Sequence, residues 1–224
     1  MTILLTRTSE GNKELIQNLS NKNYQFIEFP LIIFEHLNEE LDELKKTIHQ
    51  YTLIITSKYS AILAAKYYAG LNLKAYVVGE RSANILKENG FNILVSSNNI
   101  NELLKSVSKT ENLLYLRGNY ITQELNFEQK EIIIYNSRYA EKFSDNVVDK
   151  VTNKEIRIIT LFSGNSARAL QNCIEFHKLE NYMKNIDLYC FSKNIGEIFY
   201  HGNFCKIKHP ISPNMKEFLQ LFEL

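Results

Sequence analysis

The chain has 224 residues, of which 45% are hydrophobic and 23% are charged, and its net charge is +1. This length allows one large domain or two small ones, and the near-neutral charge counts against nucleic-acid binding, for which a basic excess is usual. Three cysteines without a C-x-x-C pair indicate no disulfide framework or zinc site, and no apolar run approaches membrane-spanning length, so we expect a cytoplasmic protein.

Apolar runs bounded by polar turns predict buried strands along the whole chain. In chain order these runs span residues 3–7, 24–29, 31–35, 53–55, 75–79, 91–95, 113–118, 132–135 and 158–162. Helix-forming runs begin after residues 12, 37, 57, 79, 100 and 163, and the second of them is expected to extend to Tyr51. The runs at 24–29 and 31–35 have no helix between them, which suggests that the chain leaves one body for another there.

The pattern restarts about half-way along the chain. Residues 113–118 resemble residues 3–7, Ser163 corresponds to Ser57, and the offset stays near ~110 residues, which is too long for a solenoid and indicates a duplicated domain. Strand–helix alternation with short turns predicts an α/β fold with two similar domains, whose parallel sheets are flanked by helices. A cleft between such domains is a common place for a small ligand.

Two strand-to-helix turns carry hydroxyl groups, at Thr56-Ser57 and at Ser163. Hydroxyls and free backbone N–H groups at the carboxyl edge of a parallel sheet are suited to anionic ligands. The alternative is that the serines only cap helices, a role in which serine is preferred. The two interpretations are compatible, and the duplication favours the functional one.

Three further side chains are candidates for the site. Arg7 and Arg117 follow equivalent apolar runs, and each could bind a ligand carboxylate or form an internal ion pair with a nearby glutamate. Tyr135 ends an apolar run and offers a phenol, although the chain has 13 tyrosines and a core role is a strong alternative.

Other chemistry is not indicated. The stretch from Gly79 to Ser82 resembles half of a glycine-rich phosphate loop but lacks the full G-x-G-x-x-G pattern. The five histidines have no metal-ligand spacing, and no G-x-S-x-G nucleophile elbow is present. The residues alone therefore predict a two-domain α/β protein for a small anionic ligand.

At these same residues the chain resembles the uroporphyrinogen-III synthase family. The resemblance is carried by a series of short segments in the family's order, namely Leu5-Thr6-Arg7, Phe29-Pro30-Leu31, Ile55-Thr56-Ser57, Val78-Gly79-Glu80-Arg81-Ser82, Leu116-Arg117-Gly118, Ile134-Tyr135 and Phe162-Ser163. Each segment is weak alone, but their order and spacing cover nearly the whole chain.

The resemblance implies two α/β domains joined by a two-stranded linker. Domain 1 would be discontinuous, with residues 1–32 and 139–224, domain 2 would span residues 37–132, and the linker strands would lie near 31–36 and 132–139. It also implies closure of the linear tetrapyrrole hydroxymethylbilane to uroporphyrinogen III, with inversion of ring D and loss of water. No metal or organic cofactor is expected, and the partner is a small-molecule polycarboxylate rather than a membrane or nucleic acid. We expect a monomer.

The resemblance also assigns roles to individual residues. Tyr135 is the candidate acid that assists loss of the substrate hydroxyl. Substrate-binding residues would line the cleft, and they are Thr56, Ser57, Gly79, Ser82 and Ser163, with Arg7 and Arg117 as carboxylate partners.

The second glycine loop of the family is altered, because Ser192 stands at its glycine and Ile195 at its threonine. The alternative is therefore a non-catalytic two-domain binding or regulatory protein that retains the same fold.

Overall fold

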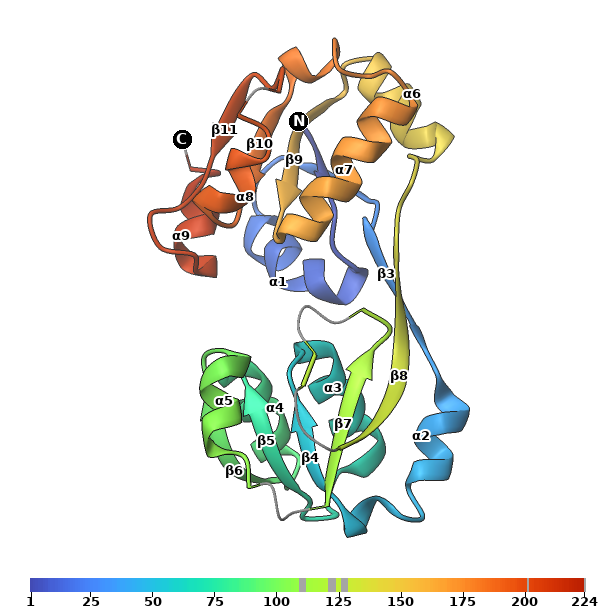
Figure 1. Ribbon diagram of the computed structural model, residues 1–224. Helices are drawn as coiled ribbons and strands as arrows, with labels where there is room; N and C mark the ends of the chain where they lie inside the picture. Colours follow the sequence, from blue (N-terminus) through green and yellow to red (C-terminus); the bar gives the residue numbers. More distant parts are fainter. Residues whose placement is uncertain (109–111, 121–123, 126–128, 201, 224) are drawn as a thin grey trace. The chain divides into compact units, whose positions relative to one another are not determined.

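The computed structural model describes residues 1–108, 112–120, 124–125, 129–200 and 202–223 (Figure 1). The chain divides into two compact units. Unit 1 comprises Met1–Ile33 and Arg138–Leu224, and unit 2 comprises Phe34–Ser137. The chain passes from one unit to the other within two strands, β3 (Ile32–His36) and β8 (Lys130–Tyr139).

Unit 2 is built on a six-stranded sheet in the order β3-β8-β7-β4-β5-β6. Its other strands are β4 (Thr52–Ile55), β5 (Lys74–Val78), β6 (Asn92–Ser97) and β7 (Leu113–Gly118). Its helices are α2 (Asn38–Leu44), α3 (Lys58–Tyr68), α4 (Glu80–Glu88) and α5 (Ile100–Ser106), with a 3-10 turn at Ile48–Gln50. The strands β4 to β8 pair in parallel, as expected for strands joined by helical crossovers.

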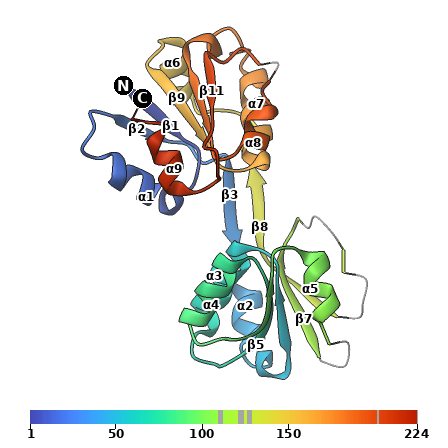
Figure 2. The same ribbon diagram turned by 90° about the vertical axis from the view of Figure 1, so that its left-hand side faces the viewer.

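The two faces of this sheet have separate cores because successive strand residues point to opposite sides. On β4, Leu53 and Ile55 pack with apolar residues of α2, α3 and α4, whereas Ile54 packs with Leu103 of α5 (Figure 2). All four residues of β4 are buried, which explains why this strand reads as a continuous apolar run.

Unit 1 is built on a five-stranded sheet in the order β11-β10-β9-β1-β2, with parallel pairing throughout. Its strands are β1 (Thr2–Leu5), β2 (Gln25–Glu28), β9 (Ile156–Leu161), β10 (Asp187–Cys190) and β11 (Lys206–Lys208). Its helices are α1 (Ser9–Leu19), α6 (Asp145–Thr152), α7 (Gly164–Phe176), α8 (Lys193–Glu197) and α9 (Met215–Gln220), with a 3-10 turn at Met183–Asn185. Helices α1 and α9 cover one face and α6, α7 and α8 the other (Figure 2).

The two sheets share one strand order once equivalent strands are matched. Unit 1 has β2-β1-β9-β10-β11 where unit 2 has β8-β7-β4-β5-β6. In chain order, however, β1 and β2 precede β4 to β6, and β7 and β8 precede β9 to β11. Each unit therefore combines strands from both sequence repeats, which explains why the offset between Arg7 and Arg117 is close to that between Ser57 and Ser163.

The α/β class with parallel, helix-flanked sheets is confirmed, and one local expectation is wrong. The helix expected to run to Tyr51 ends at Leu44 and is followed by the separate 3-10 turn, a break that keeps Ile48 buried. Strand β8 continues beyond the apolar run that ends at Tyr135, as far as Tyr139, and lies beside β3 in the sheet. The backbone N–H of Leu37 donates to Ile134 and that of Ala140 to Leu31.

Candidate functional site

In unit 2 the predicted residues gather at the carboxyl edge of the parallel sheet. Thr56 and Ser57 follow β4, Gly79 follows β5, and Arg117 lies at the end of β7. Tyr135 joins them from β8, where it pairs with Gly118, the last residue of β7. The carboxyl edge of a parallel sheet is where open α/β folds bind their ligands.

Ser57 has two roles at this edge. It is the N-cap of α3, and its Oγ accepts a hydrogen bond from the backbone N–H of Ser60 at 2.9 Å. The same oxygen donates to Ser60 Oγ at 2.9 Å and lies 3.1 Å from the phenol oxygen of Tyr135. The capping interpretation therefore holds, and the cap also contacts the candidate acid.

Tyr135 is enclosed, with only 7% of its surface exposed. Its ring meets the Tyr59 ring edge-to-face at 4.8 Å between centroids, and the Phe34 ring at 5.7 Å. On another side it packs against Gly118, where an added Cβ would lie 2.5 Å from Tyr135 Cζ. The core interpretation of Tyr135 is thus correct for its ring, while its hydroxyl reaches Ser57.

Tyr59 is itself held from two sides. Its ring stacks on Phe34 at 4.2 Å between centroids, and its hydroxyl hydrogen-bonds Nε2 of His36 on β3. Burial, together with the neighbouring Tyr135, raises the pKa of the Tyr59 phenol above its ordinary value. Tyr59 therefore remains a neutral phenol at physiological pH.

Thr56 makes a second hydroxyl pair beside the first. Its Oγ1 lies 2.8 Å from the phenol oxygen of Tyr115, which comes from β7. Burial raises the pKa of Tyr115, and the hydrogen bond with Thr56 acts in the opposite direction. The edge thus carries two hydroxyl pairs. Thr56 pairs with Tyr115 of β7, the neighbour of β4, and Ser57 pairs with Tyr135 of β8, the next strand in the sheet.

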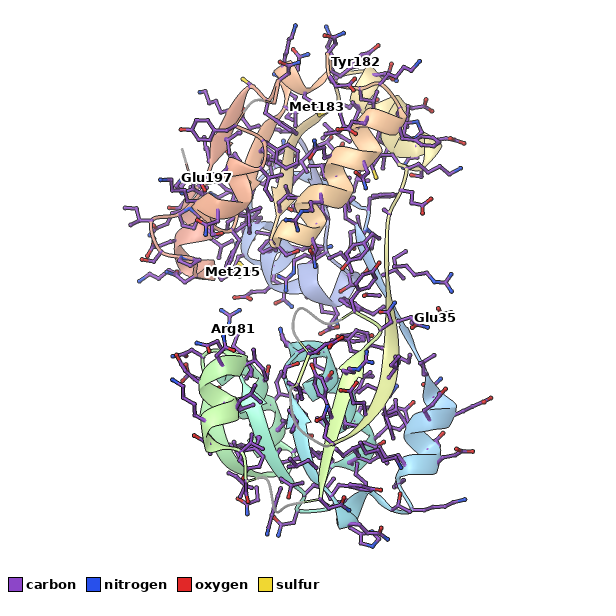
Figure 3. All side chains as sticks on the ribbon, viewed as in Figure 1. Glu35, Arg81, Tyr182, Met183, Glu197 and Met215 are labelled. Carbon is purple, nitrogen blue, oxygen red and sulfur yellow. The ribbon has the colours of Figure 1, made fainter. Side chains whose placement is uncertain are left out.

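Gly79 and Ser82 form the adjacent turn between β5 and α4. Gly79 has φ +90°, a region that favours glycine, and its backbone N–H donates to Ser97 O at 2.8 Å. Ser82 is buried on the first turn of α4, where an added Cβ on Gly79 would lie 3.7 Å from its Oγ. Arg81, labelled in Figure 3, is exposed on the same turn and adds a cation there.

Arg117 forms the internal ion pair that the sequence left open. Its Nε lies 2.7 Å from Oε2 of Glu131, and Nη1 donates to the carbonyl of Gly118 at 3.0 Å. Both partners of the ion pair are largely shielded, with side-chain exposures of 18% and 30%. This guanidinium is therefore engaged by the protein itself.

Unit 1 repeats the serine turn at the end of β9. Ser163 is the N-cap of α7, and Ser163 and Ser166 form a capping box with their hydroxyls 2.9 Å apart. The guanidinium carbon of Arg7 lies 4.6 Å from the centre of the Phe162 ring, a cation–π contact. Arg7 and Ser163 thus belong to one turn region in unit 1.

The altered second loop has a physical explanation. Ser192 occupies in unit 1 the place of Gly79 in unit 2, but its φ is −150°, an extended conformation that any residue adopts. Ile195 is 8% exposed and belongs to the core that contains Phe199. In unit 1 this loop therefore lacks both the positive φ and the buried hydroxyl found in unit 2.

Several residues of the cluster were missed from sequence, namely His36, Tyr59, Ser60, Tyr115 and Gly118. A signal existed for Ser60, because Ser57 and Ser60 have the same spacing as Ser163 and Ser166. The two tyrosines had none, since nothing local separates them from the chain's other tyrosines.

Two surface hollows occur in unit 1, away from the predicted residues. One of about 440 Å³ lies between α1 and α9, and one of about 250 Å³ lies beside α8 and β11. Neither is lined by a predicted site residue, so the candidate site is defined by the hydroxyl cluster instead.

Within the described part of the chain, no three histidine, cysteine or carboxylate side chains are grouped so that they could hold a metal ion. None of the helices among these residues has the length and apolar character needed to span a membrane.

Comparison with known proteins connects this arrangement to one family. A family model described as Uroporphyrinogen-III synthase HemD matches residues 13–220. No curated protein sequence matches the chain.

Two solved structures have similar folds. One is uroporphyrinogen-III synthetase from Helicobacter pylori, with 16% identity, a TM-score of 0.61, and coverage of 99% of this chain and 98% of that one. The other is a mutant uroporphyrinogen III synthase from the extremely thermophilic bacterium Thermus thermophilus, with 11% identity, a TM-score of 0.60, and coverage of 100% and 98%. At these identities the likeness shows the fold, and the family match over 13–220 confirms the resemblance found in the sequence.

Proposed function

The chain belongs to the uroporphyrinogen-III synthase family, and from this we propose how its own residues carry out the family's reaction. The enzyme is a cyclising lyase that needs no cofactor. It closes hydroxymethylbilane to uroporphyrinogen III, with inversion of ring D and loss of water.

We assign the first chemical step to Tyr135. The substrate's pyrrole expels its own hydroxyl to give an azafulvene, and the phenol donates its proton to that hydroxyl so that water leaves. The observation that carries the assignment is the contact of 3.1 Å between the Tyr135 and Ser57 oxygens at the carboxyl edge of the sheet. Either oxygen of this pair can donate, so Ser57 can stabilise the phenolate that forms by turning its one hydroxyl proton from Ser60 Oγ to Tyr135.

The second step closes the ring, and in it the protein acts by positioning. The substituted carbon of ring D attacks the azafulvene carbon to give a spiro intermediate. The bond from that ring D carbon to the methylene of ring C then breaks, and this methylene, now a second azafulvene, bonds to the free α-carbon of ring D, which inverts the ring. Holding a flexible chain in that geometry raises the effective concentration of the reacting groups, which is a main source of rate. The proton that ring D releases when the macrocycle forms returns to the phenolate, so only water is lost overall.

The substrate carboxylates need hydrogen-bond donors. The hydroxyls of Thr56, Ser57, Ser82 and Ser163 supply them, together with the N–H groups in the first turns of α3 and α7, and Gly79 lines the site without a side chain. Arg7 supplies a cation from unit 1. Arg117 is a further carboxylate partner, and a carboxylate ligand would have to displace Glu131 from it.

We also propose that the enzyme acts in the cytoplasm as a monomer. Its cysteines, Cys173, Cys190 and Cys205, are free thiols, which suits a reducing compartment. Light scattering of the purified chain tests the monomer.

The decisive experiment is a product assay with enzymatically generated hydroxymethylbilane. We expect uroporphyrinogen III to form faster than the spontaneous ring closure. Formation of uroporphyrinogen I alone, at the spontaneous rate, would overturn the enzymatic function and favour a binding protein with this fold.

A further inference from the structure

We infer that Tyr59 is a positioning residue for Tyr135, and that His36 holds Tyr59 in the orientation this requires. The inference rests on the proposed role of Tyr135 and extends it to a second tyrosine that does not itself transfer the proton. It follows from the contacts among β3, α3 and β8 within unit 2.

The Tyr135 ring has neighbours of different kinds. Gly118 leaves no space for even one additional carbon on its side, so the ring cannot be shifted there without moving backbone. On other sides the ring meets the aromatic rings of Tyr59 and Phe34. The position of the phenol therefore depends on whether these two aromatic rings stay in place.

Tyr59 is the better placed of the two to control the phenol. Its ring is the closer one, at 4.8 Å between centroids in an edge-to-face arrangement, which is a favourable geometry for two aromatic rings. It also lies on the first turn of α3, two residues after Ser57, the hydrogen-bond partner of the phenol. Tyr59 and Ser57 thus hold the ring and the hydroxyl of Tyr135 from the same turn.

His36 connects this turn to the strand by which the chain enters unit 2. Its Nε2 hydrogen-bonds the Tyr59 hydroxyl, and Phe34, two residues earlier on β3, stacks on the Tyr59 ring. Phe34 and His36 lie on the same face of β3, because alternate strand residues point the same way. Tyr59 is therefore fixed by one contact at its ring and one at its hydroxyl, both from β3.

The test is a double-mutant cycle between positions 59 and 135, with steady-state turnover as the readout. Tyr59→Leu removes the ring, and we expect kcat to fall about ten-fold or more while KM changes by less than about two-fold. Tyr59→Phe keeps the ring and loses only the bond to His36, so kcat should fall by about five-fold or less. Circular dichroism and thermal unfolding identify any variant that fails to fold. Tyr59→Phe keeps the ring, so we expect it to fold like the wild type.

The cycle is completed in a Tyr135→Phe background. A residue that acts through the phenol has nothing to position there, so Tyr59→Leu should change the residual rate by less than about two-fold. Tyr67→Leu is the matched control, because Tyr67 lies on the same helix and its hydroxyl also has a polar partner, Asn38. It should leave kcat unchanged in both backgrounds.

The possible results separate the two proposals. If Tyr135→Phe is slow but Tyr59→Leu has wild-type kcat, or slows both backgrounds equally, the positioning role is wrong and the role of Tyr135 stands. If Tyr135→Phe turns over at the wild-type rate, the proposed acid is wrong and the positioning role falls with it.

Discussion

Gly118 and Tyr135 lie side by side on neighbouring strands, and the glycine has no Cβ because the tyrosine ring occupies its place. An added Cβ would lie 2.5 Å from Cζ and 2.8 Å from the phenol oxygen of Tyr135. The register of β7 and β8 makes these two residues partners. Position 118 therefore requires glycine because a larger residue would clash with the Tyr135 ring, and not because of its backbone conformation.

Gly118→Ala should displace the phenol and lower both stability and turnover. Overpacking of this kind costs about 1–3 kcal/mol, measurable by denaturant unfolding. Gly164→Ala is the control, since its added Cβ would meet its nearest neighbour at an ordinary 3.8 Å. The stability cost of Gly118→Ala should shrink in a Tyr135→Leu background, and an undiminished cost there would contradict the steric explanation.

Tyr135→Phe should reduce turnover much more than product binding. The ring and its packing remain, so only the proton donor and the hydrogen bond to Ser57 are lost. General acid catalysis contributes roughly 10²–10⁴-fold, and we expect kcat to fall by about 10²-fold or more. Product affinity, measured by calorimetry, should change little. Wild-type turnover would remove Tyr135 from the mechanism while leaving the hydroxyl cluster as a binding site.

Gly79→Ala should destabilise unit 2 through its backbone. The φ of +90° and ψ of 127° at Gly79 strain any residue with a Cβ, at a cost of about 1–3 kcal/mol. Ser192→Gly in the equivalent turn of unit 1 serves as the comparison, and it should cost less than about 1 kcal/mol because the extended φ of −150° is open to all residues. Equal costs in thermal or denaturant unfolding would show that the two turns do not differ in this way.

The three thiols should differ in reactivity. Burial raises the pKa of the Cys173 and Cys190 thiols to about 12, so both stay protonated at pH 8, whereas Cys205 is exposed. Since the thiolate is the reactive form, a thiol-specific reagent should modify one cysteine rapidly in the native protein and three after denaturation. Rapid reaction of two or three thiols in the native protein would contradict the burial of Cys173 and Cys190.

The same thiols affect stability at high pH. Their folded-state pKa values lie above the ordinary value of 9.0, so their contribution is fully present below about pH 9 and is lost as the pH rises toward 12. The free energy of unfolding should therefore decline over that range. Replacing both thiols by alanine should reduce the slope.

What the sequence could predict was mostly local. The strand at 53–55, the cap at Ser57 and the helix after it depend on neighbouring residues, and all are present in the structure. The hydrogen bond of Ser57 to Tyr135 spans 78 positions, and no periodicity encodes it. The ion pair of Arg117 was one of two open alternatives, because a sequence does not show that Glu131 lies on the adjacent strand.

The helix that was expected to reach Tyr51 ends early because tertiary packing outweighs local preference. Leu41, Leu44 and Ile48 have helical spacing, yet a break between the last two keeps all three buried. The buried side chain of Ile48 is held by the core of unit 2, which spacing along the chain does not show.

The exchange of strands between the repeats determines the order in which the two sheets can form during synthesis on the ribosome. Unit 2 is continuous in sequence, so its sheet is complete once β8 has been made. Strand β1 can pair early with β2, but its other edge must wait much longer, because β9 comes from the last third of the chain, with Leu5 opposite Thr160. Until then Ile3, Leu4 and Leu5 form an unprotected apolar edge, and such edges are prone to pair with other chains. Strand β1, the first to be synthesised, is thus among the last to have both of its edges paired.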